Sequence, residues 1–432
     1  MSRVAADRFE SAYTRSLLPA AAAKLSARRA IRGQAGVAPS QAWALGGAVI
    51  LPGLIDLHGH PEWNVFAAWE PPRLYPNRAA WRSSAECAAV ITRPMSALTK
   101  DFTDKEFLAV LARYAEIRAL VGGTTAIQGS SGEYPTAPQA LVRHLDLAPF
   151  GDANAAALID PLSPSKAADR TKIITGMSNG TITAFYAHLA EGVDAASRDE
   201  FKAFDELNLL TEATVVIHGT ALAPRQLGAM REIGAKLVWS PQSNLRLYGK
   251  TTAAATALKL GLPLGLGADW LPSGSVGLLA ELQVARRVLA AQGARLDAAT
   301  LVEVVTQRAA EIAGLAARLG QIAVGRPADL LVLERLHDDP FESVCRSERG
   351  SVELVAIGGH LLYGRDDWFA ALEPAKAQAG ATGETVWAWG RKMRLDVAAA
   401  DDPTGHHPPL PGLQATRAQI LARYLRAGPI FA

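Results

Sequence analysis

The chain has 432 residues, of which 49% are hydrophobic and 20% charged, an ordinary composition for a globular protein with one large domain and a smaller companion. The formal net charge is only +2 and the charges are dispersed along the chain, which argues against a nucleic-acid partner. No apolar run reaches the roughly twenty residues that a membrane-spanning helix needs, so we expect no membrane association. Two cysteines, Cys87 and Cys345, are too few for a disulfide framework and are typical of the reducing cytoplasm, the location we expect.

The first 45 residues show little of the alternation that predicts strands. The short apolar run from Leu17 to Ala23 follows Arg15 and is similar to the hydrophobic part of a signal peptide. Asp7, Glu10 and a proline within the run weaken that interpretation. We therefore expect an alanine- and arginine-rich helical extension, with a signal peptide as the alternative.

Two histidines, His58 and His60, lie at the end of the apolar, strand-like run 54–60. Because side chains alternate across a strand, both imidazoles point the same way. Neutral imidazole is a common zinc ligand, so this pair is typical of one half of a metal site. A turn pair without a ligand role is the alternative.

A helix is predicted for residues 103–121, where apolar side chains recur at helical spacing. Gly122 and Gly123 end this helix before a strand at 124–129. Three later strand-like runs carry polar side chains at their ends. They end in His188, His218 and Asp269, and Glu191 follows His188 by three residues.

Eight strands can be placed along the chain in this way, at 54–60, 124–129, 141–147, 155–160, 181–188, 213–218, 235–240 and 263–268. Polar residues at the carboxyl ends of several parallel strands are typical of the active site of a (β/α)8 TIM barrel. We therefore predict an α/β fold built on such a barrel. Beyond it, residues 366–379 and 413–425 are predicted to be helical, joined by a polar, proline-rich linker that holds His406 and His407.

The ordered motifs resemble those of the amidohydrolase superfamily, and within it the mononuclear-metal branch of triazine hydrolases and aminohydrolases. The matching segments are Pro52–His60, Gly122–Thr125, His188–Glu191, Ile217–Gly219, Ser240–Gly249, Gly265–Asp269 and Gly320–Leu333. The resemblance covers about residues 46–363. It implies four parts: an N-terminal extension with a partial β-sandwich (1–47), the barrel (48–320), a return into a small accessory β-sandwich (321–365) and a helical tail (366–432).

The resemblance also implies roles for individual residues. His58, His60, His188 and Asp269 would bind one divalent metal, Zn²⁺ or alternatively Fe²⁺, and would leave one coordination position open for water. Glu191 and His218 would be the catalytic proton handlers, together with the ligand Asp269. A binuclear site is disfavoured, because the predicted fourth strand (residues 155–160) and the residues after it contain no bridging lysine.

Each assignment has a structural alternative. Glu191 is also compatible with a carboxylate at a helix start, His218 with a core histidine bonded to backbone, and Asp269 with a turn residue. The loop after the first strand is rich in aromatic and basic residues. From it and from other strand ends we select six candidate substrate contacts: Trp63, Asn64, Arg73, Gln128, Asn244 and Trp270. Packing of the loop against the barrel or a partner subunit is the alternative, and the one we favour for Trp81.

We therefore predict a hydrolase that uses a metal-activated water to cleave a C–N bond at an sp² carbon of a small cyclic amide, amidine or heterocycle. Deamination or dechlorination of a heterocycle is the alternative. The bulky Trp270 after Asp269 departs from the small residues familiar from guanine deaminases, which counts against deamination. A non-catalytic scaffold of the same fold is a further alternative. We expect a small-molecule substrate and a homo-oligomer of two or more subunits.

Overall fold

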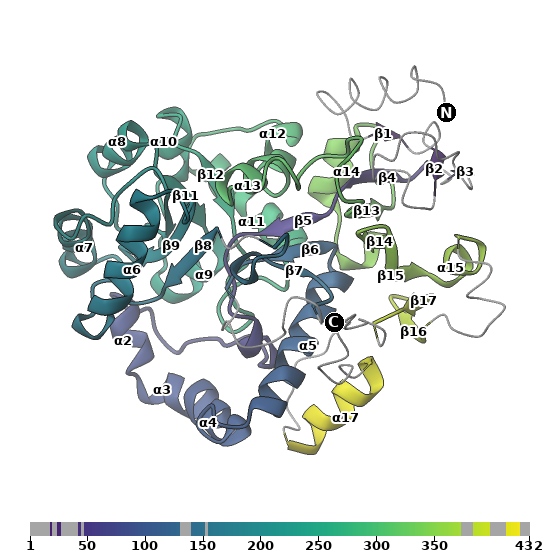
Figure 1. The fold of residues 1–432 in the computed structure, drawn as a ribbon, viewed down its shortest axis with the longest axis horizontal. Coiled ribbons are helices and arrows are strands. Elements are labelled where there is room, and N and C mark those ends of the chain that lie inside the picture. The colour runs from purple at the N-terminus through teal and green to yellow at the C-terminus, as the bar shows by residue number, and fades with distance from the viewer. Residues whose placement is uncertain are drawn as a thin grey trace.

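The computed structural model describes residues 18–19, 24–26, 42–44, 47–129, 140–151, 154–372, 383–397 and 412–423 (Figure 1). His406 and His407 lie outside these residues. Among the described helices, none is both long and apolar enough to cross a bilayer.

Eight short parallel strands carry the polar residues singled out in the sequence. Three form one sheet in the order β5 (Leu54–Asp56), β6 (Thr124–Ile127), β7 (Arg143–His144). Five form a second sheet in chain order, namely β8 (Ala155–Leu158), β9 (Ala184–Leu189), β10 (Thr214–His218), β11 (Lys236–Trp239) and β12 (Leu264–Leu266). Backbone hydrogen bonds join the two sheets at one seam, from Leu57 N to Leu266 O (3.2 Å) and from Asp269 N to His58 O (2.9 Å).

Helices follow most of these strands and pack against them. They are α5 (Lys105–Val121), α6 (Ala167–Ser178), α7 (Ala195–Glu206), α8 (Pro224–Ile233), α9 (Pro241–Tyr248), α10 (Ala254–Lys259), α11 (Leu278–Ala291), α12 (Ala298–Glu303) and α13 (Gln307–Ile312). Figure 1 shows α6, α7 and α8 on the outside of β9 and β11. The predicted helix 103–121 is confirmed as α5. It begins where the Asp104 side chain accepts a hydrogen bond from Phe107 N (3.1 Å) and ends before Gly122.

The segment between β5 and α5 is mostly helical rather than an open loop. It contains η1 (Pro61–Val65), α2 (Arg78–Arg82), α3 (Ala85–Cys87), η2 (Ala88–Thr92) and α4 (Arg93–Thr99). Asn77 begins α2 by accepting a hydrogen bond from Ala80 N (2.9 Å), and Ser84 begins α3 in the same way at Cys87 N (3.1 Å). This segment lies next to the carboxyl ends of the parallel strands and supplies one side of the site described below.

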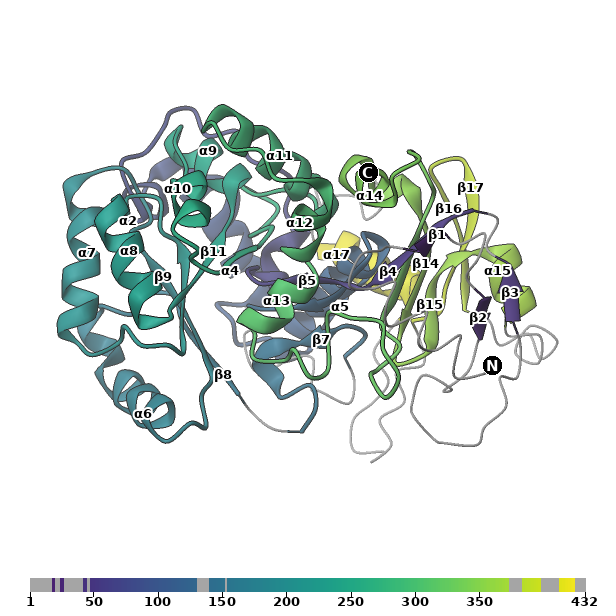
Figure 2. The same ribbon diagram turned by 90° about the horizontal axis from the view of Figure 1, so that it is seen from above.

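A seven-stranded antiparallel sheet lies to one side of the parallel strands (Figure 2). Its order is β1 (Leu18–Pro19), β4 (Val49–Pro52), β13 (Leu330–Leu333), β14 (Val352–Ile357), β15 (His360–Arg365), β17 (Arg391–Leu395) and β16 (Glu384–Ala388). Alternate side chains pack on opposite faces: Leu51 and Leu331 join the large core, whereas Ile50 and Val332 join a small cluster with Phe369 of α15 (Asp366–Leu372).

Both ends of the chain differ from expectation. The described pieces of residues 1–46 are strands, β1 together with the pair β2 (Lys24–Ser26) and β3 (Ala42–Ala44), so the predicted helical extension is wrong for these pieces. The tail contains the predicted helices as α15 and α17 (Leu413–Arg423), but also the β16–β17 hairpin. Pairing with β15 stabilises this hairpin, a long-range contact that local pattern does not reveal.

Candidate metal centre

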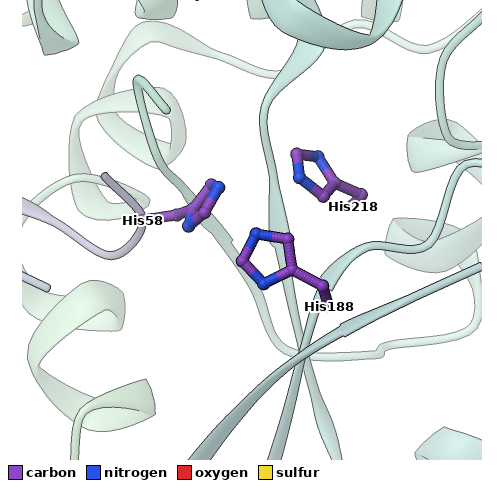
Figure 3. A group of neighbouring side chains, drawn as sticks. All are labelled: His58, His188 and His218. Atoms are coloured by element: carbon purple, nitrogen blue, oxygen red, sulfur yellow. The ribbon is translucent and has the colours of Figure 1, made fainter. Parts of the chain in front are cut away.

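The polar side chains at the strand ends meet in one place. His58 follows β5, His188 lies in β9, His218 ends β10, and Asp269 follows β12. Figure 3 shows the rings of His58, His188 and His218 turned towards one another from three separate strands. The centroid of the His58 ring lies 4.7 Å from that of His188 and 5.0 Å from those of His60 and His218.

These side chains form two overlapping groups with metal-ligand spacing. One contains His58, His188 and His218, and the other contains His58, His60 and Asp269; within each group the potential ligand atoms lie within 4.8 Å of one another. Asp269 Oδ1 lies 3.2 Å from His58 Nε2 and 3.6 Å from His60 Nε2. The structure thus brings all four predicted ligands together and places His218 equally close to them.

The backbone around the centre is strained in the way that active sites often are. His218 and Asp269 have φ values of 69° and 60°, in the left-handed region that side chains with a Cβ rarely occupy. At Gly267, a Cβ would lie only 2.4 Å from the Cβ of His58, so only glycine allows β12 to approach this histidine so closely. The unfavourable backbone conformations of His218 and Asp269 therefore accompany the placement of their side chains at the centre.

The electrostatics favour uncharged imidazoles. Burial lowers the pKa of His188 and of His218 well below the usual value, and desolvation together with the neighbouring His58 lowers the pKa of His60 to about 4. Neutral imidazole is the form that binds metals. Neither ring nitrogen of the buried His58 makes a hydrogen bond of good geometry, although Nε2 lies 3.2 Å from Asp269 Oδ1, and a bound cation would relieve this costly arrangement. The donor set therefore suits a divalent metal.

Glu191 is held at the edge of this cluster by three neighbours. Tyr248 donates a 2.6 Å hydrogen bond to Glu191 Oε1, and Arg78 Nη1 lies 3.6 Å from Oε2. Burial raises the pKa of Glu191 to about 7, although Arg78 and Tyr248 oppose this shift. Its Oε2 atom is buried, has no hydrogen-bond partner and lies 3.7 Å from His218 Nε2. A hydrogen bond thus fixes Oε1, whereas Oε2 has no hydrogen-bond partner and can exchange a proton near neutral pH.

His218 is oriented by an amide rather than by backbone. Asn244 Nδ2 lies 3.2 Å from His218 Nδ1, and Asn244 Oδ1 accepts from Thr251 Oγ1 at 3.3 Å. With Asn244 Oδ1 accepting, its Nδ2 donates, so His218 Nδ1 is the acceptor and the proton of the neutral ring is on Nε2. That proton points towards the side of Glu191. Thr252 also donates to the His218 carbonyl oxygen (2.5 Å) and helps to fix the unusual backbone.

A cavity of about 240 Å³ opens over the cluster. Five side chains of the cluster line it, namely His60, His188, Glu191, His218 and Asp269. Trp63, Trp81 and Trp270 form an aromatic wall, with the ring of Trp270 5.7 Å from that of Trp63 and 5.6 Å from that of Trp81. Five further lining residues, Arg78, Arg82, Cys87, Ile91 and Thr92, come from the helical segment 78–92 that also supplies Trp81.

The six predicted substrate contacts separate into two groups. Trp63 and Trp270 line the cavity. Asn64 instead accepts a hydrogen bond from Leu271 N (2.8 Å), and Gln128 donates to Asp146 (3.1 Å); both lie beside the cluster but outside the cavity. Arg73 has 65% of its side chain exposed, stacks over Tyr75 and does not line the cavity. Asn244 acts on His218 rather than on the cavity.

Three side chains of the site were not assigned from sequence. Tyr248 connects two parts of the site, because Trp81 Nε1 donates to its hydroxyl (2.9 Å) while that hydroxyl donates to Glu191. Arg78 and Arg82 both pair with Asp160, at 2.7 Å and 3.1 Å. The arginines stand in the basic loop noted in the sequence, but nothing local marks Tyr248, which lies 57 residues from its partner Glu191. Trp81 packs the segment, as predicted, and also lines the cavity.

Comparison with known proteins identifies the family. Residues 49–362 match the model of the amidohydrolase family. The chain belongs to this family. Among its curated relatives is a 5-methylthioadenosine/S-adenosylhomocysteine deaminase of Syntrophobacter fumaroxidans, 24% identical over 67% of this chain and 73% of the relative. A guanine deaminase of Rattus norvegicus is 31% identical over shorter segments, 38% and 37% of the two chains.

Solved structures show the same fold at low sequence identity. An adenosine deaminase from Xanthomonas campestris with bound zinc superposes with a TM-score of 0.53, at 20% identity over 77% of this chain and 85% of that one. Atrazine chlorohydrolase from Arthrobacter aurescens TC1, complexed with zinc, gives a TM-score of 0.55 at 18% identity, over 73% and 84%. The family and its deaminase members make this amidohydrolase a hydrolase of carbon–nitrogen bonds other than peptide bonds. The alternative of a non-catalytic scaffold is therefore dropped.

Proposed function

We propose that this amidohydrolase displaces an amino group, by hydrolysis, from an sp² ring carbon of a small planar nitrogen heterocycle. The observation that carries the proposal is Oε2 of Glu191, which has no hydrogen-bond partner and is buried beside His218 Nε2 in a tryptophan-lined cavity. A carboxyl group with a pKa near 7 can exchange protons with the attacking water and the leaving group, and the imidazole N–H of His218 can donate a hydrogen bond to the substrate.

His58, His60, His188 and Asp269 would hold one divalent metal, Zn²⁺ or Fe²⁺. When bound, such an ion supplies Lewis acidity that makes water nucleophilic at neutral pH. The lowered pKa values of His60 and His188 support this ligand set, because these imidazoles need not lose a proton to bind. We propose one metal per chain rather than two, since the segment from β8 to Asp160 offers no bridging lysine.

Glu191 would move the protons. A pKa of about 7 lets the carboxylate accept a proton from the attacking water and return it to the departing nitrogen. Tyr248 and Arg78 hold the carboxylate so that Oε2 remains turned towards His218 Nε2. Pre-positioning of this kind removes reorganisation that would otherwise slow the proton transfer.

His218 would donate a hydrogen bond rather than bind the metal. Its Nδ1 atom accepts from Asn244, so Nε2 carries the proton and is not free to act as a ligand. The Nε2–H group could instead polarise a ring nitrogen or oxygen of the substrate. His218 can therefore lie as close to His58 as the proposed ligands do without itself binding the metal.

The substrate would be small and flat. Trp63, Trp81 and Trp270 offer faces and edges against which a planar ring can stack. A cavity of about 240 Å³ lies below the roughly 300–1,000 Å³ typical of pockets for drug-sized ligands, which favours a single ring system over a large conjugate. Arg78 and Arg82 add positive charge to the lining of the cavity, which would favour a substrate with a carbonyl or acidic substituent.

Deamination is preferred to ring opening because two relatives and one structural neighbour are named as deaminases. The bulk of Trp270, which counted against deamination in the sequence, is accommodated in the wall of the cavity. Hydrolysis of a cyclic amide or amidine is the second candidate, and dechlorination the third.

We also propose that the two parallel sheets form one (β/α)8 barrel. The backbone hydrogen bonds between the residues that follow β5 and β12 support this closure.

The test is a panel of aminopurines, aminopyrimidines, aminotriazines and cyclic amides incubated with the metal-loaded enzyme. We expect ammonia release from at least one exocyclic amine, with the ring intact by NMR. A Glu191→Gln variant with full metal content serves as the control and should release none above background. Ring-opened product without ammonia would replace deamination by ring hydrolysis, and turnover by the Glu191→Gln variant would overturn the mechanism.

A further inference from the structure

A second hollow, of about 410 Å³, lies on the other side of the residues that follow Asp269. One wall is formed by α9, α11 and the loop 271–276, and the other by residues 348–350 with Trp389, which follows β16. None of the catalytic side chains lines it. The hollow is therefore separate from the tryptophan-lined cavity, although the two share the loop after Asp269.

The lining of this hollow is strongly basic. Arg246, Arg287 and Arg349 face it, against the single carboxylate of Glu348. Arg287 is exposed and has no hydrogen bond or ion pair with any other described residue. Its guanidinium group is thus free to bind a ligand. In the guanidinium group five donors are arranged in a planar fork that matches carboxylate and phosphate oxygens.

The charge of Arg246 is only weakly balanced. Arg246 Nη1 contacts the carbonyl oxygens of Pro272 (3.3 Å) and Gly274 (3.4 Å), which carry no net charge. Its ion pair with Glu70 is long, at 3.6 Å, and Glu70 has 83% of its side chain exposed, so water screens the pair. Arg349 also lines the hollow and lies over the Trp389 ring at 5.7 Å. Negative charge in the hollow would be favourable.

We propose that this hollow is a binding site for a small anion that carries phosphate or carboxylate groups. Three arginines line one space large enough for such a ligand, the guanidinium group of Arg287 has no partner among the described residues, and Gln242 and Gln283 add further polar groups to the lining. This site is independent of the reaction proposed above, because its ligand contacts none of the groups that handle the substrate.

Helix α9 connects the two sites. Gln242 and Arg246, four residues apart, face the hollow, whereas Asn244 and Tyr248 on the other side of the helix hold His218 and Glu191. The loop after Asp269 also lines both sites: Trp270 lines the catalytic cavity, and Gly274 and Ser275 line the hollow. An anion in the hollow would therefore contact the elements that position the catalytic side chains.

The test is isothermal titration of the metal-loaded, full-length protein with inorganic phosphate, pyrophosphate and succinate at constant ionic strength. We expect saturable binding of one anion per chain. Arg287→Ala should weaken it by about tenfold or more, as expected for loss of one charge-assisted contact. Arg225→Ala provides the matched control, because Arg225 is an exposed arginine on α8 that does not line the hollow. Preference for phosphates over succinate, or the reverse, identifies the ligand class.

Three results would overturn the proposal. The first is no saturable binding of any of the three anions in the millimolar range. The second is equal weakening by Arg287→Ala and Arg225→Ala, which would mean non-specific attraction. The third is a change of oligomeric state in Arg287→Ala without any anion binding to the unaltered protein, which would assign the hollow to an interface between copies. Because Arg287 is exposed, its replacement should leave folding intact, and a thermal melt checks this.

Discussion

Tyr248→Phe removes the contact that orients Glu191, together with the acceptor of the Trp81 Nε1–H hydrogen bond. The substitution removes the hydroxyl that donates a 2.6 Å hydrogen bond to Glu191 Oε1 and keeps the aromatic ring. A hydrogen bond to a charged group contributes about 1.5–3 kcal/mol, and each 1.4 kcal/mol corresponds to a factor of ten. If that energy is realised in the transition state, kcat should fall by about 10- to 100-fold. Metal content should change little, because Tyr248 does not belong to the proposed ligands, and KM should change less than kcat, because Tyr248 itself does not line the cavity.

The pH profile gives a second readout. The Tyr248 hydroxyl opposes the burial that raises the pKa of Glu191 to about 7, so its loss should raise this pKa further. Glu191 must be ionised to act as a base, and the rising limb of kcat/KM against pH should therefore move to higher pH in Tyr248→Phe. A purely structural role would lower activity evenly across the pH range instead.

Tyr75→Phe is the matched control for this experiment. Tyr75 is also buried in the segment over the cavity, and its hydroxyl donates to Ser84 (3.3 Å) rather than to Glu191. Steady-state kinetics from pH 5 to 9 and thermal melts should be recorded for both variants. The reasoning is refuted if Tyr248→Phe retains kcat within about twofold and an unshifted limb, since the hydrogen bond would then contribute almost nothing to catalysis.

Four further substitutions separate the roles at the site. Glu191→Gln should keep its metal and lose about 10²–10⁴-fold in turnover, the usual contribution of a positioned acid–base group; activity near that of the unaltered enzyme would contradict it. His218→Ala should likewise keep its metal by elemental analysis, and metal loss would make His218 a ligand. Trp63→Ala should raise KM by about 2- to 10-fold, equivalent to the 0.5–1.5 kcal/mol of an aromatic pair. Arg73→Ala should leave KM and kcat unchanged, because its side chain is 65% exposed and outside the cavity; a raised KM would place it at the substrate.

The strand ends were predictable because their signal is local. The strands that supply the site are short apolar runs with a polar residue at or just after their ends, so His58, His188, His218 and Asp269 could be assigned to strand ends from the sequence. Convergence of those ends follows from the parallel arrangement alone. The registers of β9, β10, β11 and β12 bear out the chain order that was expected of them.

What the sequence did not reveal depends on how distant segments meet. The contact between Tyr248 and Glu191 is fixed by the direction of α9 after β11, which no local pattern encodes. Arg73 and Asn64 lie in the segment expected to contact substrate, but Asn64, in η1, accepts a hydrogen bond from Leu271 N and Arg73 is exposed, so neither lines the cavity. A loop rich in aromatic and basic residues indicates a site, whereas the side chains that reach it are selected by packing.

The central claim is that four side chains hold one catalytic metal, and metal content per chain tests it most directly. Elemental analysis of the purified protein should give about one equivalent of zinc or iron, with the content sharply reduced in His188→Ala and in Asp269→Ala. His360→Ala, which removes an exposed histidine on β15, should leave the metal content unchanged. Two equivalents per chain, or full metal content in both His188→Ala and Asp269→Ala, would contradict the account.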